Sequence, residues 1–212
     1  MPKPIRYLIY AAAIALLAYN SVYFKKLDEV KAGTTAFDAA GYAKDFWEKK
    51  LTPGLSKAVD LNVLTSLLEA DKEKAFNAHS HALGIGNIRY FLVRGQGVVT
   101  HVDENEVSVQ LTDAGAKTAT PHVRIATEYI FGNAVRDASG AIDINAFTNS
   151  MDFNNVSAEI NRIIRDTVVP PFKSKVRKGD RVVFTGAIEL NRGHLQTNDI
   201  EVIPVNLQIE KP

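Results

Sequence analysis

Apolar and polar positions divide the chain into a charge-free N-terminal segment, a helical region and a region of strands. The first segment, residues 7–24, would span roughly 27 Å as a helix, which is just enough to cross a hydrocarbon core. Lys3 and Arg6 precede it, and this charge bias places the N-terminus in the cytoplasm and the remainder outside. We therefore predict an uncleaved signal anchor, a transmembrane helix over residues 1–24, in preference to a cleaved signal peptide or a buried helix.

Helical periodicity resumes after residues 25–36, which are polar and small and predict a linker. Apolar residues recur at helical spacing over residues 37–86, which predicts a helical part of the main domain. A Thr-Pro-Gly sequence at residues 52–54 is expected to end the first of these helices. Asp60 and Asp71 precede two further helical stretches and are predicted N-caps.

The pattern changes to strands at Ile88. Three stretches of strand-like residues reach Phe131, and the third is expected to present its alternate residues, up to Phe131, on one face. A helical stretch follows over about residues 145–169, and the prolines at residues 170–171 are expected to end it. Two more strands end near Ile209. Five strands with a helix between the third and the fourth is the order of an OB-type barrel.

The predicted fold class is therefore α+β. It combines an N-terminal transmembrane helix, a helical segment and an OB-like five-stranded barrel with a helix between strands three and four. The helical segment over residues 37–86 and the barrel over residues 87–212 together form the predicted main domain, residues 37–212.

Two glycines inside the first long strand, Gly95 and Gly97, pose a choice between a nucleotide-binding loop and a bent strand. The nucleotide motif needs a third glycine and a following helix. Thr100 occupies the third glycine position and more strand follows. The spacing therefore predicts a bend or a close approach of another backbone.

Composition narrows the chemistry. The 25 basic and 24 acidic residues give a net charge of +1, which argues against a general nucleic-acid binder. There is no cysteine, so disulfides, thiolate catalysis and cysteine-type metal sites are excluded. The sequence also holds no nucleophile elbow, Walker A loop or zinc-protease motif. We therefore expect no catalytic residues, no metal site and no cofactor.

Four residues are candidates for contacts with a polar ligand: Arg136, Asp137, Asn149 and Asn161. The two asparagines belong to an amide-rich stretch that is a poor match to helix propensity. Their amides could bond loop backbones, which is the more common role, or bind a polar ligand such as a sugar.

A basic loop over residues 173–181 has three interpretations. It could lie in solvent, contact lipid head groups, or bind nucleic acid together with the strand aromatics Tyr90 and Phe91. The solvated loop is the preferred interpretation, and nucleic acid is the least favoured partner.

Three stretches carry a resemblance to a bacterial family of predicted periplasmic lipoproteins, a family of unknown function. They are FDAAGYAKDFWEKKLTPGLSKAVDL, FLVRGQGVVTHVD and GNAVRDASGAIDINAFTNSMDFNNVSAEIN, with KGDRVVFTGAIEL and a late IPV after them. The resemblance implies an extracytoplasmic OB-like barrel with N-terminal helices, and an accessory role in carbohydrate uptake. The chain departs from the family label because it has no lipobox cysteine, so residues 7–24 are the expected replacement for a lipid anchor.

The leading functional hypothesis is a binding or scaffolding protein of the bacterial inner membrane, single-pass, with its C-terminal domain in the periplasm. Its expected partners are ABC-transporter components or a small polar ligand. One alternative is a stand-alone oligosaccharide- or nucleic-acid-binding OB barrel. A further alternative is a hydrolase with an unrecognised site.

Overall fold

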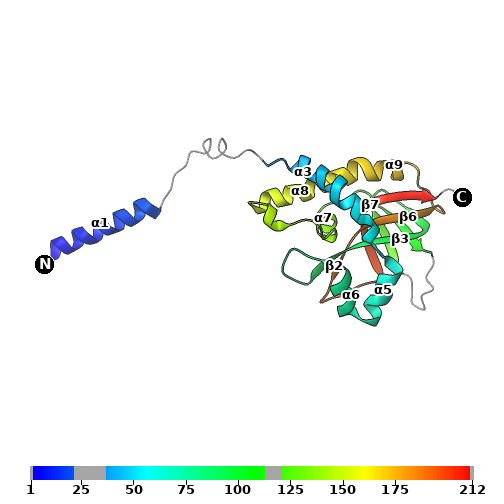
Figure 1. Cartoon of the computed structure of the whole chain (residues 1–212), viewed down its shortest axis with the longest axis horizontal. Coiled ribbons are helices and arrows are strands. Elements are labelled where there is room, and N and C mark those ends of the chain that lie inside the picture. Colours follow the sequence, from blue (N-terminus) through cyan, green and yellow to red (C-terminus); the bar gives the residue numbers. More distant parts are fainter. Residues whose placement is uncertain (1, 22–36, 113–120, 211–212) are drawn as a thin grey trace. The chain divides into compact units, whose positions relative to one another are not determined.

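The computed structural model describes residues 2–21, 37–112 and 121–210. The chain divides into two compact units, Met1–Phe37 and Asp38–Pro212. Within the described residues, the first unit holds helix α1 (Lys3–Ser21), and the second holds the other helices and the sheet (Figure 1). The predicted linker over residues 25–36 lies outside the described residues.

The predicted transmembrane helix is wrong. Helix α1 begins at Lys3 and includes Arg6 in its first turns, and the polar residue Asn20 lies near its end. These residues lower the mean hydropathy of the helix, and the predicted apolar run extends to residues 22–24, outside the described part. No helix in the described ranges is long and apolar enough to cross a bilayer.

The second unit contains seven α-helical segments within the described residues. They are α3 (Ala39–Phe46), α4 (Thr52–Gly54), α5 (Leu61–Ala70), α6 (Lys72–His79), α7 (Ala134–Ala138), α8 (Ser150–Ile163) and α9 (Val169–Lys173). The two predicted N-caps are confirmed. The Asp60 carboxylate accepts from the first turn of α5, and the Asp71 carboxylate does the same for α6.

The two proline sites have different outcomes: α-helical structure ends at Gly54, as predicted, whereas the helix predicted to end at residues 170–171 continues. A π-helical turn, Trp47–Leu51, leads into α4, and a second, Ile164–Val168, leads into α9. Each of α4 and α9 has a proline at its start, where the missing N–H is not required. The chain therefore stays helical through residues 170–171, and the predicted stop there is wrong.

One mixed sheet of seven strands accompanies these helices in the described part of the second unit. The strands are β1 (Val59–Asp60), β2 (Ser80–His81), β3 (Ile88–Val102), β4 (Glu106–Leu111), β5 (His122–Ala126), β6 (Arg181–Asn191) and β7 (Asp199–Glu210). Their order is β1-β3-β4-β5-β7-β6, with β2 paired to β3 outside this order. The β1–β3 and β5–β7 pairs are parallel, and the others are antiparallel.

The sheet coils along β3 but is not the closed five-stranded barrel that the sequence predicted. β6 pairs with β3 from Ile88 to Val98, and β4 pairs with it from Gly97 to Val102. Among the described residues of β3, only Gly97 and Val98 pair with both β4 and β6. These two strands therefore overlap very little along β3. The short strands β1 and β2 extend the sheet along the first half of β3. The prediction of five strands missed them because a two-residue strand leaves no alternation in the sequence.

The two glycines of β3 allow close packing, as the spacing predicted. A Cβ atom at Gly97 would lie 2.4 Å from the carbonyl oxygen of Gln110, on the neighbouring strand β4. A Cβ atom at Gly95 would lie 2.6 Å from the ring of Phe184, on β6. The strand continues past both residues to Val102, so no phosphate-binding loop is formed.

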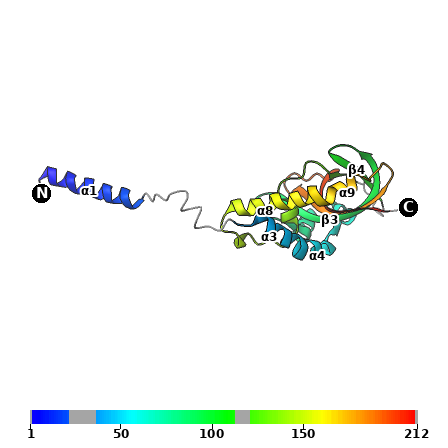
Figure 2. The same ribbon diagram turned by 90° about the horizontal axis from the view of Figure 1, so that it is seen from above.

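Two apolar cores lie on opposite faces of the sheet. The inner core joins the concave face of the sheet to α5, α6 and α9, and includes Phe91, Val93 and Phe184. The outer core joins the other face to α3, α7 and α8, and includes Leu92 and Ile160. Figures 1 and 2 show α3 lying beside α8 in this outer layer. Because neighbouring residues of β3 enter different cores, this strand is apolar on both faces.

Candidate functional site

A hollow of about 520 Å³ lies over β5, β6 and β7, and we call it the first hollow. This volume is within the range of ordinary small-molecule sites. The segment that follows β5 and the segment between β6 and β7 complete its wall. Its charged and hydrogen-bonding side chains include Arg124, Glu189, His194, Gln196, Asp199 and Glu201.

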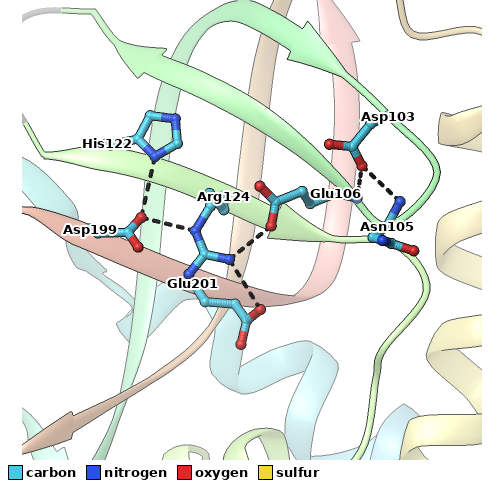
Figure 3. Close-up of polar contacts among 7 residues, drawn as sticks. All are labelled: Asp103, Asn105, Glu106, His122, Arg124, Asp199 and Glu201. Carbon is cyan, nitrogen blue, oxygen red and sulfur yellow. Dashed lines mark hydrogen bonds and ion pairs between the residues drawn. The ribbon is translucent and has the colours of Figure 1, made fainter.

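Arg124 is the centre of a polar network that joins three strands (Figure 3). Its Nε donates to Asp199 Oδ1 at 2.9 Å, and its Nη1 donates to Glu106 Oε2 at 2.8 Å. The same Nη1 lies 3.6 Å from Glu201 Oε1, and His122 Nδ1 lies 3.2 Å from Asp199 Oδ1. The network orients the guanidinium along the floor of the first hollow.

The network favours the charged forms of Arg124 and Asp199. The hydrogen bond from Arg124, assisted by the contact with His122 and partly opposed by burial, holds the pKa of Asp199 below its ordinary value. Hydrogen bonds to Asp199 and Glu106 raise the pKa of Arg124 above its already high ordinary value. Asp199 is therefore a charged acceptor at neutral pH, which suits binding better than proton donation.

The β3–β4 turn positions Glu106 for this network (Figure 3). Asp103 Oδ1 accepts from the backbone N–H groups of Asn105 at 2.8 Å and Glu106 at 2.9 Å. These two bonds, the one from Glu106 first, lower the pKa of Asp103. The carbonyl of Asn105 in turn accepts from the backbone of Thr127 at 2.8 Å, which ties the turn to the segment after β5.

Two exposed aromatic side chains stand on the wall of the first hollow. Tyr129 is 63% exposed and Phe131 is 71% exposed, whereas Ile130 between them is 1% exposed. The buried residue and a hydrogen bond from Arg165 Nη1 to its carbonyl fix the segment. The sequence predicted these aromatics as part of a strand face, but β5 ends at Ala126. The alternation of apolar and polar residues therefore did not reveal that the two rings are exposed.

The predicted pair Arg136 and Asp137 lies in α7 and is almost completely buried. Arg136 Nε donates to Asp137 Oδ1 at 2.6 Å, and its Nη1 donates to the carbonyl of Phe153 at 3.2 Å. The guanidinium carbon also lies 3.5 Å from the centroid of the Phe153 ring. Both charged residues line a second hollow of about 350 Å³, which also contacts Tyr90 and Asn154.

The two predicted asparagines lie elsewhere. Asn149 caps α8, with its side-chain oxygen accepting from the N–H of Asp152 at 2.8 Å, and it lines neither hollow. Asn161 donates to the carbonyl of Gly132 at 2.9 Å and lines a third hollow of about 300 Å³. The structure thus brings Arg136 and Asp137 together and separates them from the two amides.

The surface predicted for nucleic acid is not formed, because Phe91 is fully buried. Its ring packs edge-on against Phe76, with centroids 5.2 Å apart, inside the inner core. In the basic loop, Lys173 donates to the carbonyl of Glu104 at 2.5 Å. One expected aromatic platform is therefore unavailable to bases.

Comparisons with known proteins agree with this architecture. An OB-fold protein from Thermotoga maritima, known from its crystal structure, is 25% identical, with a TM-score of 0.72. The similarity covers 83% of this chain and 100% of that protein. No curated protein matches the chain.

The family indicated by the sequence is confirmed. Residues 12–208 match the model of the family described as predicted periplasmic lipoprotein, DUF2291. This description supports the predicted periplasmic location, whereas a single-pass anchor has no support in α1. The chain belongs to the DUF2291 family of predicted periplasmic lipoproteins.

Proposed function

We propose that the protein is a periplasmic binding protein whose first hollow holds a neutral ligand rich in hydroxyl groups, an oligosaccharide. The observation that carries this proposal is the combination of the Arg124 network on the floor with the exposed aromatics Tyr129 and Phe131 on the wall. Exposed aromatic faces can pack against the apolar face of a ligand, while the polar floor orients it.

The polar groups of the first hollow suit hydroxyls because a hydroxyl both donates and accepts. Glu189 and Glu201 can accept from a ligand, whereas Arg124 and the amide of Gln196 can donate to one. Donors and acceptors in one wall favour a polyol over a ligand that can only accept.

The position of the hollow supports the same proposal. OB folds bind oligonucleotides and oligosaccharides over their second and third strands and the loops after strands one and four. In this chain β5 is the third of the five longer strands, and it contributes Arg124. The loop after the fourth of them, β6, contributes His194 and Gln196.

Charge favours a sugar over a nucleic acid. Three carboxylates, Glu189, Asp199 and Glu201, line the first hollow together with Arg124. Phosphate groups require an excess of cations, and this hollow has an excess of anions. The guanidinium at its floor in turn disfavours a polycation.

Isothermal titration of the full-length protein with cello- and malto-oligosaccharides tests the proposal. We expect binding to at least one series, and Tyr129→Ala to weaken it about five- to tenfold through loss of aromatic contact. Gln196→Ala should weaken it about fivefold through loss of one hydrogen bond.

Gln208→Ala is the matched control for Gln196→Ala, because Gln208 is an exposed residue of β7 that does not line the first hollow. Spermidine and an oligothymidylate serve as cationic and anionic comparators. Binding of either comparator without binding of any sugar would overturn the proposal, as would equal effects of the two glutamine substitutions.

Association with ABC-transporter components stays a separate prediction. It would be tested by affinity purification of the full-length protein from its own cells in mild detergent, followed by mass spectrometry. Near-stoichiometric transporter subunits would support it, and recovery of the protein alone would contradict a stable complex.

A further inference from the structure

The second hollow lies beside the first on the same side of the β3–β6 strand pair. Tyr90 of β3 lies opposite Glu189 of β6 in the register, and Tyr90 lines the second hollow while Glu189 lines the first. Ile88 and Asn133 line both hollows. The two spaces are therefore neighbouring parts of one concave surface, with Asn133 at their junction.

The Arg136–Asp137 pair gives the second hollow a fixed polar wall. Arg136 is held by Asp137, by the Phe153 carbonyl and by the Phe153 ring, so its guanidinium has one orientation. Within the described residues, the hydrogen bonds of this pair use Nε and Nη1 of Arg136 and Oδ1 of Asp137. Arg136 Nη2 and Asp137 Oδ2 remain as a donor and an acceptor from adjacent residues that line the hollow.

The chemistry of this wall limits the ligand class. The buried pair has no net charge, so an ionic ligand would bring an unbalanced charge against it. Neighbouring hydroxyls of a sugar can accept from the guanidinium and donate to the carboxylate together. Exposed Ile85 and Ile144, which also line the hollow, supply apolar surface for the sugar ring.

We propose that the second hollow is a further subsite of the same binding surface, and that the ligand is an oligosaccharide chain long enough to occupy both hollows. The chain passes Asn133, and one of its units lies against Arg136 and Asp137. This inference rests on the proposed function of the first hollow and extends it from a single pocket to a groove.

Asn154 provides a variant that tests the subsite without disturbing the core. It is exposed on α8 and lines the second hollow but not the first. Asn155 is the matched control, because it is exposed on the same helix and lines neither hollow. Thermal unfolding of both variants checks that they fold as the wild type does.

The experiment is isothermal titration of the full-length protein with di- to hexasaccharides of the cello and malto series. We expect affinity to rise with chain length and then level off. Asn154→Ala should weaken hexasaccharide binding about fivefold and leave disaccharide binding in the larger first hollow unchanged. Gln196→Ala should weaken both, and Asn155→Ala neither.

Two results would overturn the subsite, and they have different meanings. If Gln196→Ala weakens the hexasaccharide and Asn154→Ala does not, the second hollow is no subsite while the proposed function of the first hollow stands. If no sugar of either series binds the wild type, the proposed function and the subsite both fail.

Discussion

Arg136 carries a buried charge that Asp137 balances, so replacing either residue alone should lower the stability of the domain. Both members of the Arg136–Asp137 pair are at most 5% exposed, so either one alone would be an unpaired charge in the outer part of the domain. We predict that Arg136→Leu lowers the free energy of unfolding by about 3–5 kcal/mol. Urea denaturation, monitored by circular dichroism, measures this loss.

Arg162 supplies the control for that substitution. It pairs with Glu159 on the surface of α8, and its side chain is 55% exposed. Arg162→Leu should therefore cost less than about 1 kcal/mol. Similar losses for the two arginines would show that burial of the Arg136 charge is not what makes it important.

Asp199 should lose its acidity when Arg124 is replaced. We predict that Arg124→Gln raises the pKa of Asp199 toward its ordinary value, because the strongest interaction that lowers it is gone. In the wild type the folded pKa is below the unfolded one. The resulting stabilisation is therefore present above the ordinary carboxyl pKa and is lost as the pH falls through the folded pKa.

A carbon-13 titration of the Asp199 carboxyl measures this shift directly. The accompanying change in stability at neutral pH should stay below about 1 kcal/mol, because Asp199 is half exposed and solvent screens the pair. Lys49→Gln, which removes a surface pair with Asp45 on α3, should leave the Asp199 titration unchanged. An unaltered Asp199 pKa in Arg124→Gln would contradict the role assigned to the guanidinium.

At this scale the sequence identified local partners but not distant ones. Asp60 and Asp71 are readable as caps because a cap acts within three residues. Arg136 and Asp137 are neighbours in the chain, and their pairing is as local. The Arg124–Asp199 contact spans 75 positions and depends on the parallel pairing of β5 with β7, which no local pattern encodes.

Among the elements, α5 depends on its N-terminal cap. Asp60 accepts from the backbone of Asn62 at 2.9 Å and of Val63 at 3.4 Å. We predict that Asp60→Ala lowers the free energy of unfolding by about 1 kcal/mol, because two N–H groups lose their acceptor. Asp60→Asn keeps an oxygen in place and should cost much less. The chemical denaturation midpoints of the two variants decide the matter, and equal losses would count against capping.

Strong periodicity predicted elements well, and their ends poorly. The amphipathic face of α5 and the long strand β3 both follow from apolar spacing. The π-helical turns before α4 and α9 do not, because they add one residue per turn without changing which residue types are apolar. Pro170 and Pro171 would stop a regular helix but are accommodated at the start of α9, which is why the end predicted at these residues was misplaced.

For the whole molecule, the second unit should be independent of the first. Residues 38–212 contain both apolar cores and form a compact unit separate from residues 1–37. We predict that deleting residues 1–37 leaves the thermal unfolding midpoint unchanged within about 2 °C, because no core residue is lost. Differential scanning calorimetry of the full and shortened chains measures this. A fall much larger than that would show that the N-terminal segment supports the fold.

The order of strands was readable from the sequence, but the degree of closure was not. Alternation identified the five long strands and the helix between the third and fourth. Whether β4 and β6 meet along β3 depends on how far each extends past Gly97, a matter of one or two residues. Such small offsets lie below the accuracy of any pattern of apolar residues.

Strand β3 contributes residues to both apolar cores, and this determines how the domain unfolds. Leu92 belongs to the outer core and the adjacent Val93 to the inner core, so one backbone segment supports both. Detaching the helices of the outer core would expose one face of β3, whose other face packs in the inner core. The domain should therefore lose its structure in a single cooperative step, and slow hydrogen exchange should give the β3 amides one common protection free energy, equal to that of global unfolding.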